Sequence, residues 1–338
     1  MTRSSFPRPN AATVVVWLLF AGFAAVPFVA GAIAQPFWVS FFARIMIYAI
    51  AASALNLALG YGGLVSFGHA LFIGLGSYAV ALPAFHGVAN GWAHLAWCVA
   101  GSALVALIVG AISLRTTGMA FIMITLAFAQ MGYFVFVSLK AYGGDDGLPV
   151  AATSRFGALD LGAMPWLYGT ALVVLALVTV WMARLRLAPF GMALRGVRQN
   201  ARRIDAIGLQ ARRLQLVAFV ISGAISGVSG LLLANLNAYA SPSTLAWTVS
   251  GELIVMVVLG GIGTVAGPIV GALVFLGLEE VLKGITEHWM AIFGPLIVVM
   301  ALVGRRGIVG LLDLRPKAPH AALRPAPPAA TVAPEGGA

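Results

Sequence analysis

The sequence has 338 residues, of which 61% are hydrophobic and 9% are charged. An ordinary soluble domain carries about 45–50% apolar and about a quarter charged residues, so this composition excludes a water-soluble globular protein. The net charge of +10 does not indicate nucleic-acid binding, because eight of the twenty basic residues lie in one segment between two apolar runs. Basic residues beside membrane spans orient a chain in the bilayer. The single cysteine, Cys98, excludes an intrachain disulfide and a cysteine-based metal cluster.

Long apolar runs predict membrane spans. Helices are the expected element, because the bilayer core offers backbone groups no water to bond and these runs are too long for barrel strands. We therefore predict an all-α, polytopic membrane helical bundle with about ten spans, at 11–34, 38–60, 63–84, 94–113, 117–138, 165–183, 215–237, 249–261, 263–282 and 288–303.

The basic residues predict the orientation of these spans. The segment 184–214 carries eight arginines against one acid, Asp205, so it is expected on the cytoplasmic side. Six spans before it and four after it then place both termini in the cytoplasm and the acidic segment 140–165 outside. The permease domain is expected to cover 1–310, and the Pro- and Ala-rich residues 311–338 to form a disordered cytoplasmic tail.

A stretch rich in glycine and polar residues, Leu55 to Tyr78, interrupts the second and third apolar runs. Its glycines predict a discontinuous helix beside a translocation path; the alternative is that they only let helices pack and that polar groups such as His69 bond a neighbour. Polar side chains inside spans avoid lipid. The candidates for the path are Asn56, Ser66, His69, Thr125 and Gln130, and the glycines of this stretch that could break or pack a helix are Gly60, Gly63, Gly68 and Gly74.

A second stretch, Val258 to Gly277, contains Gly263, Gly267 and Gly271 at intervals of four residues. That spacing puts all three on one face of a continuous helix and predicts a helix-packing surface. The alternative is a pore-lining break at Gly260 and Gly261.

The basic segment contains the third informative stretch, Ala188 to Gln215. A helix is expected to start after Pro189 and to stop at Gly208. Its length suggests a docking surface for a cytoplasmic partner. A loop that only sets topology, or one that rests on anionic membrane lipid, is the alternative.

The sequence contains no GxxxxGK[ST] loop, no HExxH and no CxxC. We therefore expect no metal site and no cofactor in this chain, and a transport subunit rather than an enzyme. If ATP with Mg²⁺ powers transport, partner subunits must hydrolyse it. Two other classes stay open: a rhomboid-like serine protease, from GxSG at Gly227 to Gly230 with His69 as base, and a secondary carrier driven by an ion gradient.

Four blocks in order resemble the M-type (LivM-like) permease subunit of branched-chain amino acid ABC importers. They are LNLALGYGGLVSFGHALFIGLG from Leu55, LRTTGMAFIMITLAFAQ from Leu114, GGDDGL from Gly143 and ELIVMVVLGGIGTVAGPIVGA from Glu252. The resemblance implies a bacterial inner-membrane importer that contains an H-type permease, two cytoplasmic ATPases and a periplasmic solute-binding protein. Relatives are associated with branched-chain amino acids, urea or short-chain amides, so the cargo stays open.

By the same resemblance, the stretch from Gly191 to Gly208 is similar to the coupling helix that fits into an ATPase groove. The residues implied in coupling are Gly191, Arg195, Arg198, Asn200, Arg202, Arg203, Asp205, Ala206 and Gly208. The family often carries acids where this chain has Gln199 and Ala201, which implies a differently charged ATPase surface.

Overall fold

The computed structural model describes residues 11–157, 159–286, 288, 290–295, 298 and 307–312. Half of the expected tenth span, 288–303, lies outside these residues, as does nearly all of the expected disordered tail, 311–338.

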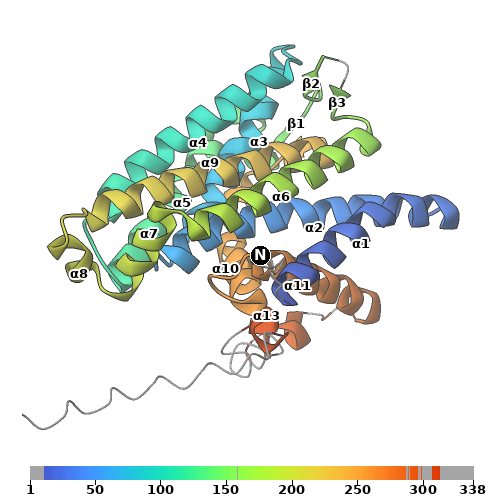
Figure 1. Cartoon of the computed structure of the whole chain (residues 1–338). Coiled ribbons are helices and arrows are strands. Elements are labelled where there is room, and N and C mark those ends of the chain that lie inside the picture. The colour runs from blue at the N-terminus through green and yellow to red at the C-terminus, as the bar shows by residue number, and fades with distance from the viewer. Residues whose placement is uncertain are drawn as a thin grey trace, which may run out of the picture.

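The described chain is helical, as the apolar runs predict (Figure 1). Among the described residues, six helices are long and apolar enough to cross a membrane, and His69–Phe85 and Trp247–Gly260 are shorter apolar helices. The number of about ten spans stays a prediction. The apolar helices of the bundle are α1 Ala11–Ile33, α2 Phe37–Asn56, α3 His69–Phe85, α4 Gly91–Ser113, α5 Met119–Ser138, α6 Met164–Leu187, α9 Ala211–Asn237, α10 Trp247–Gly260 and α11 Gly267–Ile285. Three further short helices are α7 Pro189–Gln199, α8 Ala201–Ala206 and α13 Gly307–Leu312.

The third apolar run, 63–84, is helical only from His69, where α3 begins. α2 continues as a π-helical turn over Leu57–Tyr61, and Gly63 then takes a φ of +71°, a left-handed conformation that ends a helix at little cost for glycine. The segment from Gly63 to Gly68 therefore crosses the protein interior without regular structure.

The core of the bundle forms around α9, which packs against α2, α3 and α4. Small residues bring these backbones together. A Cβ on Gly76 would lie 1.9 Å from the carbonyl oxygen of Gly227, and one on Gly230 would lie 1.9 Å from that of Ile73. Such contacts between small residues are how helices associate where lipid removes the hydrophobic driving force.

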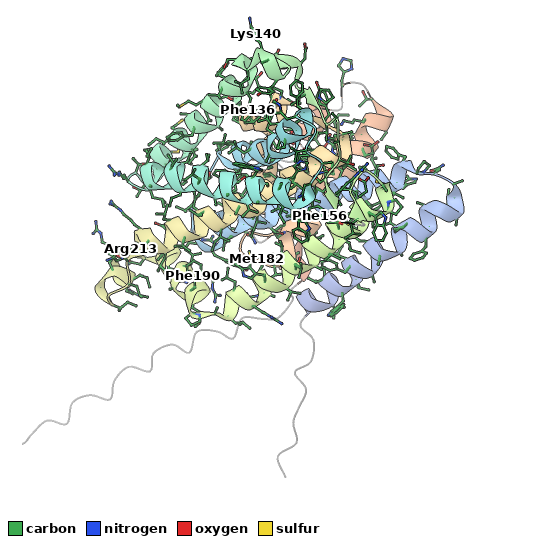
Figure 2. All side chains as sticks on the ribbon, turned by 90° about the horizontal axis from the view of Figure 1, so that it is seen from above. Phe136, Lys140, Phe156, Met182, Phe190 and Arg213 are labelled. Atoms are coloured by element: carbon green, nitrogen blue, oxygen red, sulfur yellow. The ribbon has the colours of Figure 1, made fainter. Side chains whose placement is uncertain are left out.

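The basic segment 184–214 and the acidic segment 140–165 lie at opposite ends of the bundle. α7 and α8 occupy one end, whereas the short strands β1 Leu148–Pro149, β2 Arg155–Phe156 and β3 Leu159–Asp160 lie at the other (Figure 1). β1 pairs antiparallel with β4, Tyr239–Ala240, and β2 pairs with β3. Figure 2 shows Phe190 and Arg213 together, away from Phe156. The basic and the acidic segments thus lie at opposite ends of the bundle, and their placement on different sides of a membrane stays a prediction.

Candidate functional site

The two glycine stretches identified in the sequence meet at the end of the bundle that carries α7. The first contributes the π-helical turn with Gly60, and the second contributes the loop between α10 and α11. A Cβ on Gly60 would lie 2.7 Å from the nitrogen and 2.9 Å from the Cα of Gly263, so the two backbones are in direct contact. We call this contact, formed by Asn56, Gly60, Gly263 and Thr264, the inner junction.

The Asn56 side chain joins the two sides of the inner junction. Its Oδ1 accepts a hydrogen bond of 2.8 Å from the backbone nitrogen of Gly263, and its Nδ2 donates one of 2.8 Å to the carbonyl oxygen of Thr264. Because Asn56 is fully buried, both ends of its amide are used inside the chain. One side chain therefore links segments that are more than two hundred residues apart.

The basic segment reaches this junction directly. Arg198 Nη1 donates to the carbonyl oxygen of Gly60, and Gln215 Nε2 donates to that of Gly62 at 3.3 Å. The carbonyls at the end of a helix have no partner within it and carry the negative end of the helix dipole, so a guanidinium is well suited to them. The segment between α6 and α9 is thus attached to the end of α2.

The predicted single helix in the basic segment is wrong, because Asn200 divides it. α7 begins at Pro189 as expected and ends at Gln199, and α8 follows. Asn200 has extended backbone angles, and its Oδ1 accepts a hydrogen bond of 3.1 Å from the nitrogen of Arg203. A side chain that caps a new helix competes with continuation of the old one. Gly208, with φ of +88°, lies beyond the end of α8.

Two other residues of the basic segment, Arg195 and Asp205, form hydrogen bonds with backbone groups, whereas several others are exposed. Arg195 Nη2 donates to the carbonyl oxygen of Arg186 at 2.7 Å and its Nε to that of Gly191 at 3.4 Å, which holds α7 on the end of α6. Asp205 Oδ1 accepts from the nitrogen of Ala211 at 2.9 Å. Arg202, Arg203 and Ala206 are exposed, and so are the large apolar side chains of Met192, Ile207 and Leu209 in the same segment.

Among the candidate path residues, Ser66 and Thr125 lie together. The Ser66 hydroxyl accepts from the nitrogen of Gly68 at 3.1 Å, and the Thr125 hydroxyl accepts from the nitrogen of Phe67 at 3.2 Å. Both side chains are fully buried. They supply hydrogen bonds to the irregular segment before α3, whose backbone would otherwise be unpaired in the interior.

His69 has a different partner. Its Nε2 lies 2.7 Å from the hydroxyl oxygen of Ser222 on α9, which in turn donates to the carbonyl oxygen of Ala54. The rings of Phe72 and Phe219 meet the imidazole edge to face. His69 is thus enclosed between α2, α3 and α9.

Gln130 is separate from the other candidates and only partly buried. It lies on an open face of α5, in a hollow of about 530 Å³. The hollow is lined by Ala127, Gln130, Met131, Phe134, Val135 and Ser138. Of the five candidate path residues, Gln130 is therefore the one on an uncovered surface.

The glycines of the second stretch do not share one helix face as predicted. Gly263 takes a φ of +77° in the loop before α11, which begins at Gly267. α10 ends at Gly260, and Gly261 has a φ of +126°. A Cβ on Gly271 would lie 1.8 Å from the carbonyl oxygen of Met256, so α10 and α11 are in close contact. The stretch combines a helix break with a packing surface.

The remaining glycines of the first stretch lie against side chains. A Cβ on Gly74 would lie 2.2 Å from Cγ of Leu245, and one on Gly68 would make ordinary contact with Ser66 and Thr125. Gly63 faces Arg198, whose Cγ would be 3.0 Å from an added Cβ.

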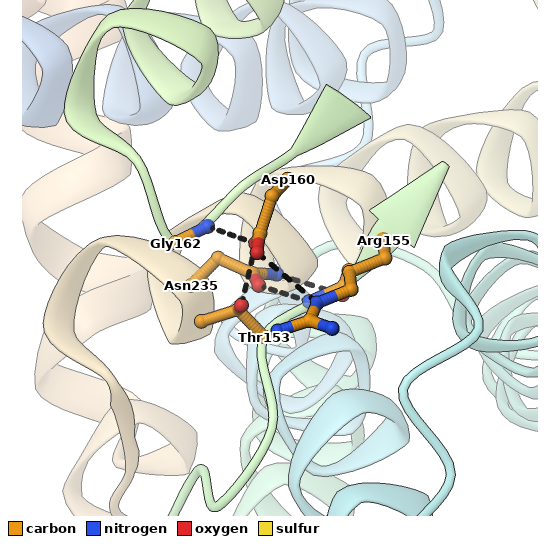
Figure 3. A network of polar contacts seen from close by, with 6 residues as sticks. Thr153, Arg155, Asp160, Gly162 and Asn235 are labelled. Atoms are coloured by element: carbon orange, nitrogen blue, oxygen red, sulfur yellow. Dashed lines mark hydrogen bonds and ion pairs between the residues drawn. The ribbon is translucent and has the colours of Figure 1, made fainter. Parts of the chain in front are cut away.

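The opposite end of the bundle contains a second polar network, which we call the outer clamp (Figure 3). The Asn235 Oδ1 accepts from the nitrogen of Ser154 at 2.9 Å, and its Nδ2 donates to the Ser154 hydroxyl at 3.1 Å. His94 Nδ1 lies 2.8 Å from that hydroxyl, while its Nε2 lies 3.0 Å from the carbonyl oxygen of Val88. A carbonyl only accepts, so Nε2 donates to it and Nδ1 accepts from Ser154, which leaves every group paired.

Asp160 completes the outer clamp at the surface. Its carboxylate accepts hydrogen bonds from the Thr153 hydroxyl at 2.6 Å and from the Gly162 nitrogen at 2.8 Å, and it forms an ion pair of 3.1 Å with Arg155 (Figure 3). The Thr153 hydroxyl and the Gly162 N–H, together with Arg155, hold the pKa of Asp160 below its usual value.

The catalytic pair of a serine protease is not brought together. The Ser229 hydroxyl donates to the carbonyl oxygen of Ser226 at 2.6 Å, whereas His69 bonds Ser222. Within the described residues, no group of three or more His, Cys, Asp or Glu side chains could hold a metal ion.

Sequence reasoning missed several residues that the structure places at these sites. Ser222 and Thr264 carry no local signal, because their partners are far away along the chain. Gln215 could have been found, since it is a polar residue in the second turn of an apolar helix.

Comparison with known proteins agrees with the resemblance seen in the sequence. Residues 37–301 match the family model for the permease component of the branched-chain amino acid transport system. The chain is 27% identical to the high-affinity branched-chain amino acid transport system permease protein LivM of Escherichia coli strain K12, over 82% of this chain and 72% of that protein. It is also 27% identical to LivH of the same strain, over 78% of this chain and 91% of LivH.

A more distant relative is the probable branched-chain amino acid transport permease protein LivM of Methanocaldococcus jannaschii, which is 25% identical over 70% of this chain and 78% of that protein. No solved structure matches the chain. The comparisons support neither the protease nor the ion-driven carrier.

Proposed function

The chain belongs to the family of branched-chain amino acid transport permease components, and from that premise we propose that it is the M-type subunit of an ABC importer in a bacterial inner membrane. Members of this family are transport components and not enzymes. The similarity to both LivM and LivH supports pairing with a related H-type permease. Two cytoplasmic ATPases that hydrolyse ATP with Mg²⁺ and a periplasmic solute-binding protein complete the proposed assembly. The proposed cargo is a branched-chain amino acid, with urea or a short-chain amide as the alternative.

The observation that carries this proposal is the attachment of the basic segment to the inner junction. We assign the docking surface for an ATPase to α7 and α8, where Arg202, Arg203, Met192 and Ile207 are exposed. Apolar side chains beside guanidinium groups are a typical composition for a protein interface. An ATPase that draws α7 and α8 would pull on α2 through Arg198.

The inner junction would pass this movement on. Arg198 is bonded to Gly60, and Asn56 connects the same turn to Gly263 and Thr264 between α10 and α11. Interrupted helices can change their angle at the interruption, which is a recurrent device for alternating access. We propose that the junction couples ATPase closure to opening of the path.

The proposed path runs along the open face of α5, where Gln130 is accessible and a second permease could supply the other wall. The other four candidates lie behind the α5 wall of this path. Their proposed role is to hold the irregular backbone in place; they are Asn56, Ser66, His69 and Thr125. A lipid-exposed amide inside the bilayer would be costly, which is why an uncovered Gln130 favours an aqueous or protein-covered surface.

The coupling proposal can be tested in the complete importer reconstituted in liposomes. Arg198→Ala should lower cargo uptake per ATP hydrolysed by about tenfold, since a hydrogen bond from a charged group contributes about 1.5–3 kcal/mol. Arg212→Ala, an exposed arginine of the same segment, is the matched control and should keep the ratio. An unchanged ratio in Arg198→Ala would contradict coupling through the inner junction.

The cargo can be tested in the same liposomes. Uptake of labelled leucine that unlabelled isoleucine and valine inhibit, and that urea and acetamide do not, supports a branched-chain amino acid. The reverse pattern would assign the importer to amides.

A further inference from the structure

A cavity of about 610 Å³ lies beside the inner junction and has no role in the function proposed above. It is bounded by α1, α6, α7, the loop before α11, and α13. The lining residues that matter for the argument are Trp17, Arg186, Leu187, Arg195, Gly263 and Thr264.

The charged side chains that line this cavity are all positive. Two guanidinium groups, those of Arg186 and Arg195, line it, and none of the described lining residues is acidic. Arg195 is held by the carbonyl oxygens of Arg186 and Gly191, whereas among the described residues the Arg186 side chain makes no hydrogen bond or ion pair. The cavity therefore offers a fixed and a free positive charge to an anion.

Apart from Thr179 and Thr264, the side chains of the remaining wall are apolar, and two of the apolar ones are exposed on the outer surface of the bundle. Trp17 is 72% exposed and Leu187 is 78% exposed. Trp17 lies on α1, and only 11% of the most apolar part of this helix is buried against the rest of the protein. A ligand here needs an anionic group for the arginines and hydrocarbon for the wall beside α1.

We propose that this cavity binds an anionic phospholipid of the membrane leaflet on the side of the basic segment. The phosphate group lies between Arg186 and Arg195, and an acyl chain follows the apolar groove between α1 and α6. Basic pockets between membrane helices suit anionic headgroups, and tryptophan is favoured at the membrane interface. Gly263 and Thr264 line the same cavity, so the bound lipid stabilises one position of the loop that Asn56 holds.

Trp17 provides a reporter for the test. The full-length chain is placed in vesicles of zwitterionic phosphatidylcholine that contain a small fraction of either brominated phosphatidylglycerol or brominated phosphatidylcholine. Bromine quenches tryptophan on contact, and subtraction of a Trp17→Phe variant isolates the Trp17 signal. Brominated phosphatidylglycerol is expected to quench Trp17 at a lower fraction than brominated phosphatidylcholine.

The arginine variants identify the headgroup contact. Arg186→Gln should weaken the preference for phosphatidylglycerol about fivefold, as expected for loss of one basic contact near a membrane surface. Arg186→Lys should keep most of it, and Arg184→Gln, one residue away from the cavity lining on the same helix, should leave it unchanged. Should Arg186→Gln fail to fold, the comparison of the two lipids on the wild-type chain decides the question.

Three results would overturn the proposal. Equal quenching by both lipids would show that any acyl chain fills the space. Absence of Trp17 quenching would show that protein covers the cavity. A preference for phosphatidylglycerol that survives in a folded Arg186→Gln variant would place the anionic contact elsewhere.

Discussion

The inner junction and the outer clamp lie at opposite ends of the same bundle and are built by different means (Figures 1 and 3). At the inner junction, two backbones touch at Gly60 and Gly263, and the side-chain hydrogen bonds from Asn56 and Arg198 that hold the contact are only partly buried. At the outer clamp, Asn235, Ser154 and His94 form a network in which every polar group is paired. A fully satisfied buried network fixes one geometry, whereas a glycine contact held by partly buried hydrogen bonds leaves a position that a pull from outside could change.

The largest expected effect comes from removing the close approach at the inner junction. In Gly60→Ala, the new methyl group would lie 2.2 Å from Asn56 Oδ1 and 2.7 Å from the nitrogen of Gly263, so the backbones must separate. We expect uptake to be lost and the free energy of unfolding to fall by about 1–3 kcal/mol. Thermal unfolding of the purified chain in detergent and uptake by the reconstituted importer measure the two effects.

Gly277→Ala is the matched control, because a Cβ at this position of α11 would meet no atom within 4 Å. The thermal midpoint should be unchanged or slightly raised, as alanine is the better helix former. Normal uptake and stability in Gly60→Ala would show that the junction tolerates a gap and has no part in coupling.

The second expected effect is loss of stability at the outer clamp without loss of coupling. Asn235→Ala leaves the buried nitrogen of Ser154 without its acceptor, which costs about 1–3 kcal/mol of unfolding free energy. Because this end is proposed as the fixed one, cargo uptake per ATP should stay within about twofold of the wild type. The exposed Asn237→Ala is the control and should unfold like the wild type. A changed coupling ratio in Asn235→Ala would show that both ends move.

Sequence reasoning found the helices of this protein more readily than their breaks. Hydropathy depends on composition, so the runs behind α1, α4 and α6 were placed within a few residues of the observed bounds. The sequence does not distinguish a glycine that takes a left-handed conformation from one that packs a helix. For this reason Gly263 was predicted on a helix but lies in a loop. The division at Asn200 went unseen because its capping bond depends on local geometry.

The candidate site was predictable in part for a similar reason. Polar residues inside apolar runs are visible in the sequence, and Asn56 was noticed in this way. Its partners in the loop between α10 and α11, and the Ser222 partner of His69, depend on which helix faces meet. The sequence of a single apolar run does not determine which face of the helix will contact which neighbouring helix.

A smaller effect, which distinguishes the two ends, is expected from Asn56→Ala. This change removes the bonds to Gly263 and Thr264 and leaves the backbone contact in place. The free energy of unfolding should fall by about 1 kcal/mol, because water can reach the partly buried N–H of Gly263 and carbonyl of Thr264. Unlike Asn235→Ala, this variant should lower uptake per ATP severalfold. A stability loss with an unchanged coupling ratio would make the inner junction as static as the outer clamp.

The smallest expected effect concerns pH at the outer clamp. Hydrogen bonds from Thr153 and Gly162 and the neighbouring Arg155 lower the pKa of Asp160 in the folded protein. A lowered folded pKa means that the ionised carboxylate stabilises the loop above the ordinary aspartate pKa of about 3.9, and that this contribution is lost as the pH falls through the folded value. The loop should therefore keep its structure from neutral pH down to about pH 4 and loosen below it.

Hydrogen exchange of the Gly162 amide, which donates to Asp160, measures this contribution. Asp160→Ala should raise its exchange rate at pH 7 by less than about fivefold, because an exposed ion pair contributes at most about 1 kcal/mol. Asp146→Ala, an exposed aspartate of the same outer segment, should leave the rate unchanged. Equal exchange in Asp160→Ala and the wild type would mean that the buried Asn235, Ser154 and His94 network alone fixes this end, and that the surface carboxylate is dispensable for it.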